Sequence, residues 1–213
     1  NGIVLISSAS SVTFSFTGKS CEIALQSTNE YGHHAYVSLE LDGKYMGRLR
    51  VEKELKNYPV HAATGKKHSL KISKATEAST GGILFNGAVA KLVPTKLKEK
   101  KKIEFIGNSI TCGMGADAIE IPCGQGEWFD QHNAYLAYGP RVARTLGANF
   151  LLSSVSGIGV YRNWDSNGPT MPQVYEKRDF QQGSKLPWNF ATYSPAIVSS
   201  ALGTNDLSRG DGK

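Results

Sequence analysis

The sequence changes its hydrophobic pattern around Pro94, and this change constrains the fold more than any other feature. Before Pro94, apolar and polar residues alternate in short segments separated by turn residues, which is typical of half-buried β-strands. After a lysine-rich run at 96–102, short apolar segments are separated by longer stretches, one of which has helical spacing. We therefore expect two domains, residues 1–94 and 103–213, joined by a basic linker at 95–102.

The first part is expected to be an all-β domain. Strands are predicted where residues alternate with period two, at 12–16, 21–25, 36–41, 44–46, 68–73, 83–85 and 88–93. Asp42-Gly43 is a hairpin signal between two of these segments, and Gly81-Gly82 and Asn86-Gly87 add further turn signals. Short strands with regular turns and no helical segment predict a β-sandwich or jelly roll.

The second part is expected to be a parallel α/β domain. Strands are predicted at 103–107, 149–153 and 196–202, and a helix at about 134–146 with Asn133 as its N-cap. Pro140 implies a kink or a later start of that helix. Its predicted apolar face comprises Leu136, Val142, Ala143 and Leu146, and Gly147 would follow its end. A short helix at about 172–179 is also expected.

The basic excess of the sequence is confined to its first part. Residues 1–102 hold 16 Lys and Arg against 8 Asp and Glu, and residues 103–213 hold 8 against 10, which gives the overall charge of +6. The lysine run contains no aromatic residue, whereas binders of single-stranded nucleic acid interleave aromatic and basic side chains. We therefore expect a solvated connector and no nucleic-acid partner. Since no run of about 18 apolar residues occurs, we expect no membrane-spanning helix.

The cysteines give no sign of a disulfide framework or a metal site. Cys21, Cys112 and Cys123 are odd in number, so at least one thiol is free, and whether Cys112 pairs with Cys123 stays open. Their spacing fits no zinc pattern, and no His and Asp cluster suited to a metal is evident. Gly-x-Gly-x-x-Ala at 113–118 starts too far beyond its strand to be a dinucleotide fingerprint. We expect neither a metal nor a cofactor.

Three residues whose groups could take part in a reaction follow the three predicted strands of the second part. Ser109 follows the first strand, Gly157 follows the second, and Asn205 follows the third. The carboxyl ends of parallel strands meet at one edge of a sheet, where α/β proteins bind their ligands. A serine nucleophile, an unobstructed glycine N–H and an asparagine side-chain donor are the groups that acyl transfer requires. The three together predict an acyl-transfer site.

Ser109 and the long segment at 158–195 can each also be explained by a purely structural role. Ser109 alone could be an ordinary helix N-cap, and Thr111 stands where a Gly-x-Ser-x-Gly nucleophile elbow needs glycine. The long segment 158–195, which contains Trp164 and Trp188, could be either a loop at the site or a surface insertion. The order of the three residues on successive strands favours the functional reading.

These residues resemble the conserved blocks of the SGNH (GDSL-type) hydrolases. Ser109 matches the block I serine, with Asn108 where many members have aspartate, and Gly157 matches the block II glycine. Asn205 matches the block III asparagine in Gly-Thr-Asn-Asp. The resemblance implies a flavodoxin-like three-layer fold and ester hydrolysis through an acyl-enzyme. Ser109 would be the nucleophile, and the Ser109 and Gly157 amides with the Asn205 side chain would form the oxyanion hole.

A more specific resemblance covers nearly the whole sequence. A β-rich first part followed by Ile-Gly-Asn-Ser-Ile-Thr-Cys-Gly at 106–113, Tyr-Leu-Ala-Tyr-Gly at 135–139 and Ser-Gly-Ile-Gly-Val-Tyr-Arg-Asn at 156–163 is similar to the family 2 carbohydrate esterases. That resemblance implies a jelly-roll N-terminal domain and a secreted or periplasmic bacterial enzyme, although no signal peptide is visible. It also implies removal of O-acetyl groups from plant-wall polysaccharide or oligosaccharide.

The catalytic histidine of this scheme is not evident in the sequence. The family carries it in block V near the C-terminus, and no Asp-x-x-His occurs here. Four of the five histidines lie in the β-rich part, and His132 comes too early to match block V. The three predicted parallel strands also leave a sheet with an uncovered edge. We therefore expect the histidine beyond Lys213, in a remaining C-terminal part of the same hydrolase domain.

Two alternatives to an active esterase remain. One is a truncated, inactive relative. The other is a non-catalytic carbohydrate-binding protein, in which the β-sandwich binds glycan and the hydrolase part is degenerate.

Overall fold

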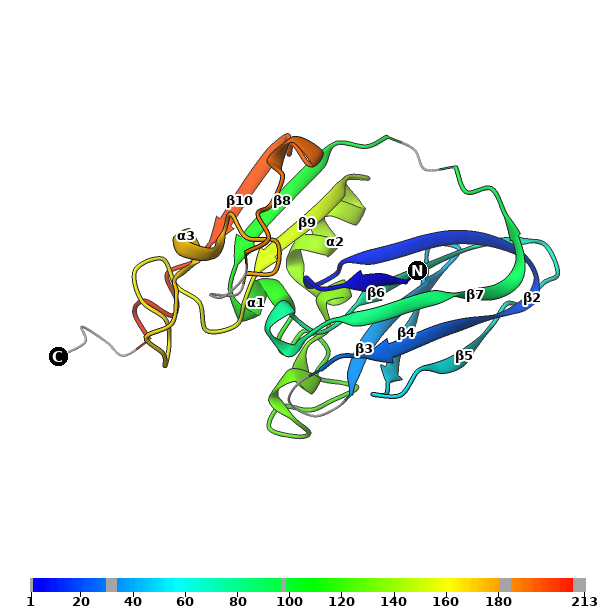
Figure 1. Ribbon diagram of the computed structural model, residues 1–213, viewed down its shortest axis with the longest axis horizontal. Helices are drawn as coiled ribbons and strands as arrows, with labels where there is room; N and C mark the ends of the chain where they lie inside the picture. Colours follow the sequence, from blue (N-terminus) through cyan, green and yellow to red (C-terminus); the bar gives the residue numbers. More distant parts are fainter. Residues whose placement is uncertain (1, 30–33, 97–98, 181–184, 209–213) are drawn as a thin grey trace.

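The computed structural model describes residues 2–29, 34–96, 99–180 and 185–208. It consists of two lobes that lie side by side (Figure 1). We call residues 2–93 the sandwich lobe and residues 102–208 the parallel lobe. The basic linker predicted at 95–102 stays a prediction, and residues 97–98 of it lie outside the described residues.

The sandwich lobe is a single antiparallel sheet of seven strands that folds over its own core. Its strands are β1 (Ile3–Leu5), β2 (Ser11–Ser27), β3 (Ala35–Leu41), β4 (Lys44–Val51), β5 (Lys56–His61), β6 (Lys67–Lys74) and β7 (Ile83–Val93). They are ordered β1-β7-β2-β6-β3-β4, with β5 also paired to β2. The pairing register of β2 with β7 shifts between Thr17 and Glu22, near Gly18 with its φ of +126°. This irregularity lets β2 pair with β6 before it and with β5 after it.

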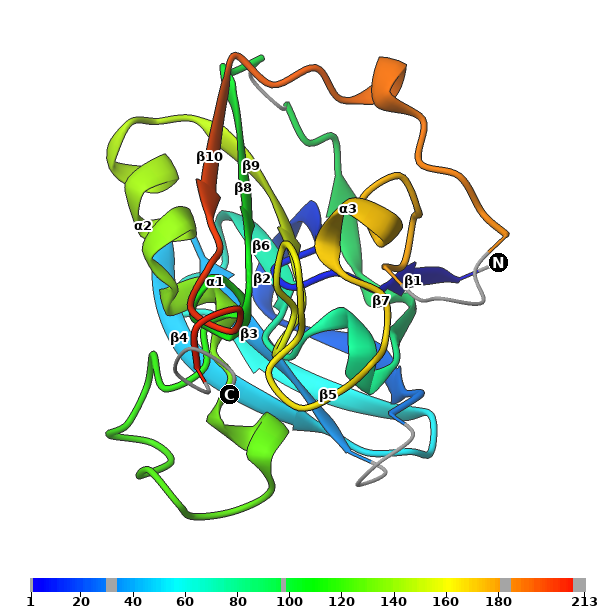
Figure 2. The ribbon, with the colours of Figure 1, turned by 90° about the vertical axis from the view of Figure 1, so that its left-hand side faces the viewer.

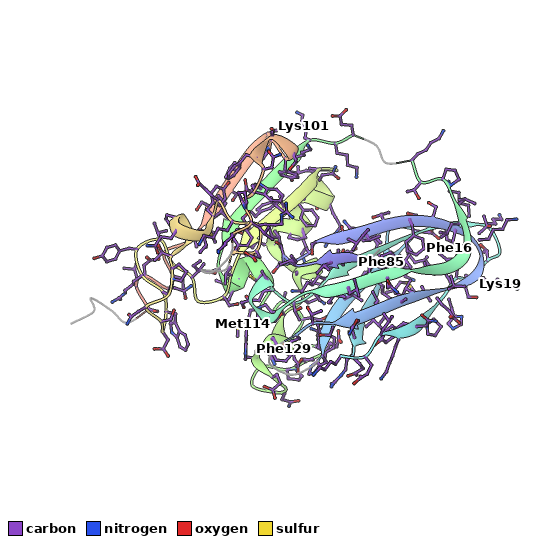
Figure 3. All side chains as sticks on the ribbon, viewed as in Figure 1. Phe16, Lys19, Phe85, Lys101, Met114 and Phe129 are labelled. Atoms are coloured by element: carbon purple, nitrogen blue, oxygen red, sulfur yellow. The ribbon has the colours of Figure 1, made fainter. Side chains whose placement is uncertain are left out.

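The predicted jelly-roll-like β domain is confirmed, with two kinds of local difference. Strands β1 and β5 were not predicted, and two pairs of predicted strands each form one continuous strand, 12–16 with 21–25 in β2 and 83–85 with 88–93 in β7. The hairpin at Asp42-Gly43 forms as predicted, with both residues at positive φ. The two strands predicted on either side of Asn86-Gly87 are one continuous strand, β7, in which Gly87 has a φ of +113°. Because β2 pairs along most of β7, the turn signal is overridden. Phe16 and Phe85 lie in the apolar interior of this lobe (Figure 3).

The parallel lobe is built on three strands, β8 (Lys102–Gly107), β9 (Asn149–Ser154) and β10 (Ile197–Ala201), in the order β10-β8-β9. Both pairings are parallel, as predicted. Helices α2 (Tyr138–Thr145) and α3 (Met171–Val174) lie on opposite sides of this sheet (Figure 2). Each side has its own apolar cluster, one around Phe105, Leu152 and Ala143 and the other around Ile158, Met171 and Val174.

The helices of this lobe are shorter than the sequence predicted. The helix expected at 134–146 is a 3₁₀ turn at Ala134–Leu136 followed by α2, because Pro140 favours the first turn of a helix. Its apolar face was predicted only in part, since Ala143 is buried whereas Val142 and Leu146 are exposed. The expected helix at 172–179 is the single turn α3.

A seam of buried polar contacts joins the two lobes. The segment after a 3₁₀ turn at Trp128–Gln131 lies against β3, β4 and β6 of the sandwich lobe. Ser38 Oγ donates to Asn133 Oδ1 at 3.0 Å, and the Ala134 amide donates to the Ala75 carbonyl at 3.0 Å. No helix in the described ranges is both long and apolar enough to cross a membrane.

Candidate active site

Ser109 begins a one-turn helix at the carboxyl end of β8. Helix α1 (Ser109–Cys112) is capped by Asn108, whose side-chain oxygen accepts from the Ile110 amide at 3.2 Å. The N-cap is therefore Asn108, and Ser109 is the first helical residue and partly exposed. Gly107 is required here because a Cβ would lie 1.9 Å from the Thr111 hydroxyl. Lys101, just before β8, and Met114, two residues after α1, are labelled in Figure 3.

Gly157 lies in the turn that follows β9. Its φ of +76° is strained for any residue with a side chain, whereas a Cβ there would meet no atom within 4 Å. Glycine is therefore needed for backbone conformation and not for packing. The space that a Cβ would occupy is open, and Gly157 is partly exposed.

Asn205 follows β10 and is joined to the turn after β9. Its side chain is buried, and Nδ2 donates to the Ile158 carbonyl at 2.7 Å. This bond uses one of the two N–H groups of the amide, so the second remains available for another acceptor. The structure thus links two of the three predicted site residues, since Ile158 follows Gly157 directly.

Asp206 holds the loop beyond Gly157 in place. Its carboxylate accepts from the backbone amides of Val160, Tyr161 and Arg162 at 2.6–3.1 Å. Burial raises the pKa of Asp206, but the three backbone hydrogen bonds outweigh that effect and lower it below its ordinary value. Asp206 is the residue after Asn205, so one short segment fixes the loop through both side chains. The exposed rings of Tyr161 and Trp164 project from this loop.

A buried charged cluster lies directly behind the site, and sequence reasoning missed it. Glu77 of the sandwich lobe and His132 of the parallel lobe are both fully buried, with Glu77 Oε2 3.4 Å from His132 Nε2. Glu77 Oε2 also accepts from the Ser156 amide at 2.8 Å, and His132 Nε2 lies 3.0 Å from Ser156 Oγ. Lys74, also fully buried, donates from Nζ to the Glu77 carbonyl.

The charge state of Glu77 follows from these contacts. Burial by itself would raise the pKa of Glu77, but the hydrogen bond and charge of His132, with hydrogen bonds from Ser156 and Ser79, lower it to about 2. Burial lowers the pKa of Lys74 to about 7, although the charge of Glu77 opposes this shift. Glu77 is therefore an anion at neutral pH, in contact with the turn that carries Gly157.

Three histidines of the described residues have structural partners. His132 is enclosed at the seam, where its Nε2 lies 3.0 Å from Ser156 Oγ. His34 Nε2 is 2.7 Å from Asp130 Oδ1, and His68 Nδ1 is 2.6 Å from Asp42 Oδ2. His61 is exposed on β5, and His33 lies outside the described residues.

The three cysteines are unpaired, which answers the question left open for Cys112 and Cys123. Cys112, the last residue of α1, is buried, and its thiol lies 3.2 Å from Ser154 Oγ. Cys123 is exposed. Within the described part of the chain, no three His, Cys, Asp or Glu side chains are grouped to hold a metal ion.

Comparison with known proteins finds one group of relatives whose similarity extends over both lobes. Residues 1–95 match the family described as carbohydrate esterase 2 N-terminal. Over 98% of its length the chain is 30% identical to the cellulase/esterase CelE of Acetivibrio thermocellus, of which it covers 25%. Over 71% of its length it is 29% identical to an acetylxylan esterase / glucomannan deacetylase of Cellvibrio japonicus, of which it covers 43%.

Solved structures agree with these relatives. A family two carbohydrate esterase from Clostridium thermocellum, in complex with cellohexaose, has a TM-score of 0.85 at 29% identity over 98% of this chain and 63% of that chain. A family two carbohydrate esterase from Cellvibrio japonicus has the same fold, with a TM-score of 0.82 at 22% identity. A carbohydrate esterase whose active site is described as having divergent catalytic and non-catalytic binding functions has a TM-score of 0.76 at 24% identity. The chain spans less than two thirds of each of these proteins.

Proposed function

We propose that this chain, which belongs with the family 2 carbohydrate esterases, carries the nucleophile and oxyanion hole of a serine esterase that removes O-acetyl groups from plant-wall polysaccharide or oligosaccharide. Ser109 would attack the ester carbonyl and form an acyl-enzyme. The Ser109 and Gly157 amides and the second N–H of Asn205 would stabilise the negative charge that develops on the carbonyl oxygen.

The observation that carries this proposal is the placement of Ser109, Gly157 and Asn205 after three adjacent parallel strands. Parallel strands bring the groups that follow them to one edge of the sheet. The hydrogen bond from Asn205 to Ile158 supports a shared site for the second and third groups. The conformational need for glycine at 157 supports the use of its amide.

The base that accepts the Ser109 proton is proposed to be a histidine beyond Lys213, in the remaining C-terminal part of the same domain. The involvement of His34, His68 and His132 in structural contacts supports this assignment. Because the substrate is a polymer of the plant cell wall, we also propose that the protein works outside the bacterial cytoplasm, secreted or in the periplasm.

The decisive experiment measures acetate released from acetylated xylan and acetylated glucomannan by the product of the whole gene. Ser109→Ala should lower kcat by about 10³-fold or more while leaving the Tm within a few degrees, because only the nucleophile is lost. Ser208→Ala is a matched control, since Ser208 Oγ donates to the Asn205 carbonyl and has no proposed part in the reaction. Equal acetate release by wild type and Ser109→Ala would contradict the mechanism.

A non-catalytic carbohydrate-binding protein is the second candidate. The exposed rings of Tyr161 and Trp164 on the loop after Gly157 favour it, because solvent-facing aromatic side chains can stack on sugar rings. Under this reading, wild type and Ser109→Ala would bind cellohexaose with equal affinity in calorimetry, and neither would release acetate.

A further inference from the structure

We propose that Glu77 and His132 are positioning residues that set the Ser156–Gly157 turn of the candidate oxyanion hole. Glu77 belongs to the sandwich lobe, so this lobe would help to position the catalytic groups. This inference rests on the proposed esterase function. It assigns a role to two fully buried polar side chains, a carboxylate and an imidazole, that the proposed reaction does not otherwise use.

The contacts hold Ser156 at its backbone amide and at its hydroxyl. Glu77 Oε2 accepts from the Ser156 amide at 2.8 Å, and His132 Nε2 is 3.0 Å from Ser156 Oγ. The Ser156 carbonyl carbon is bonded to the Gly157 nitrogen, so fixing Ser156 restricts the direction of the Gly157 N–H. Glycine at φ +76° has no side chain to restrict the turn from its own position.

Glu77 is itself rigidly held. It precedes the 3₁₀ turn η1 (Ala78–Thr80), and its carbonyl accepts from Lys74 Nζ and from Thr80 Oγ1. Its other carboxylate oxygen accepts from Ser79 Oγ. Five polar contacts therefore fix one side chain and its backbone, including the two with Ser156 and His132. A carboxylate held in this way restricts the position of the turn that it contacts.

The same cluster also touches the helix that begins at Ser109. Cys112, the last residue of α1, interacts with Glu77 and with Ser154 at the end of β9. Glu77 therefore contacts the turn that carries the second oxyanion donor and interacts with the last residue of the helix that carries the nucleophile. A displacement of Glu77 would alter the spacing of both groups, and misplacement by about 1 Å can cost about 10²-fold in rate.

Ser156, His132 and Glu77 have the residue types of a catalytic triad, but their geometry excludes that role. In a triad, the serine and the carboxylate bind opposite nitrogens of the imidazole. Here both approach Nε2, and Nδ1 has no hydrogen-bond partner among the described residues. His132 and Glu77 are also fully buried, so no substrate reaches them.

The test compares kcat and KM of variants made in the product of the whole gene, with acetylated xylan as substrate. Glu77→Ala removes the acceptor for the Ser156 amide and should lower kcat about 10- to 100-fold with KM nearly unchanged. Glu77→Gln keeps an acceptor oxygen and should restore kcat to within a few-fold of wild type. Ser156→Ala keeps the amide bond and should lower kcat only several-fold.

Variants at other contacts between the two lobes control for a general loss of stability at the seam. Ser38→Ala and Tyr135→Phe remove the buried contacts to Asn133 and Glu40, and neither contact involves the Ser156 turn. Both should keep wild-type kcat at a comparable loss of Tm. A kcat of Glu77→Ala equal to that of these controls would overturn the proposal, as would a failure of Glu77→Gln to recover activity.

Two further outcomes separate this inference from the function on which it rests. Activity in Ser109→Ala would refute the esterase mechanism itself, whereas loss there with normal activity in Glu77→Ala would refute only the positioning role. If Glu77→Ala does not fold, the kinetics of Ser156→Ala test the positioning role in its place. A several-fold lower kcat at unchanged KM supports the role, and either wild-type kcat or a loss as complete as that of Ser109→Ala overturns it.

Discussion

Asn205 donates a 2.7 Å hydrogen bond from Nδ2 to the carbonyl of Ile158, which lies 47 positions earlier in the chain. The bond joins the segment after β10 to the turn after β9. Asn205→Asp preserves shape but replaces the donor with a carboxylate that would repel the Ile158 carbonyl. We expect kcat to fall by about 10²-fold or more, because a donor to the oxyanion is also lost.

Steady-state kinetics of the whole gene product and thermal unfolding check this prediction together. Asn205→Asp should also lower the Tm, because its buried side chain loses a partner. Wild-type kcat in a variant with a lowered Tm would show that Asn205 links the two segments without taking part in the reaction.

Gly157→Ala tests the conformational requirement at the turn. A Cβ there meets nothing within 4 Å, so the cost arises from the φ of +76° and should be about 1–2 kcal/mol in the free energy of unfolding. Gly147→Ala is a matched control, because Gly147 has a φ of +63° and equally open surroundings after α2. We expect both variants to lose similar stability in urea unfolding, and only Gly157→Ala to lose kcat.

Lys74 should make the protein more stable as pH rises from 7 to 9. Its pKa is lowered to about 7 in the folded state, whereas an unfolded lysine titrates near 10.5. Between these values the unfolded chain binds more protons, so the free energy of unfolding increases with pH. Below pH 7 both states are protonated and this contribution to the slope disappears.

Urea unfolding of this chain at pH 7, 8 and 9 measures the effect of Lys74, with Lys74→Met as the control. Methionine fills a similar volume and does not titrate, so the slope between pH 7 and 9 should become smaller. An unchanged slope in Lys74→Met would assign the pH dependence to other groups.

The thiols should differ sharply in reactivity. Burial raises the pKa of Cys21 to about 11, and burial with the nearby charge of Glu77 raises the pKa of Cys112 well above its ordinary value. Cys123 is exposed. Iodoacetamide at pH 8 should therefore modify Cys123 alone in the folded protein, as read by peptide mass spectrometry, and all three in urea. Rapid alkylation of native Cys112 would contradict the burial of its side chain.

Much of the fold could be predicted because its strands are locally encoded. Period-two alternation found β3, β6 and two separate parts of β2, and Asp42-Gly43 found the hairpin between β3 and β4. The length of β2 could not be predicted, since its 17 residues pair first with one neighbour and then with another. Such pairing depends on distant strands and leaves no local signal.

The candidate site was found by the same logic. Ser109, Gly157 and Asn205 could be picked out because each follows a short apolar strand, and the parallel pairing of β8, β9 and β10 agrees with that reading. Whether these residues perform the chemistry stays a prediction.

The cluster behind the site was beyond sequence reasoning. Glu77 contacts Ser156 across 79 positions, and both were assigned to separate predicted domains. A glutamate after an alternating strand is normally read as a surface residue. Only the folded chain shows that Glu77 is fully buried and paired.

The seam between the lobes bears on how such a protein can be rearranged. A module that merely adds affinity for a ligand can be exchanged or removed without harm to its neighbour. Here, removal of residues 1–94 would uncover His132 and leave the Ser156 amide without its acceptor. The two lobes should therefore be inherited, and engineered, as one unit, although a lysine-rich segment separates them in the sequence.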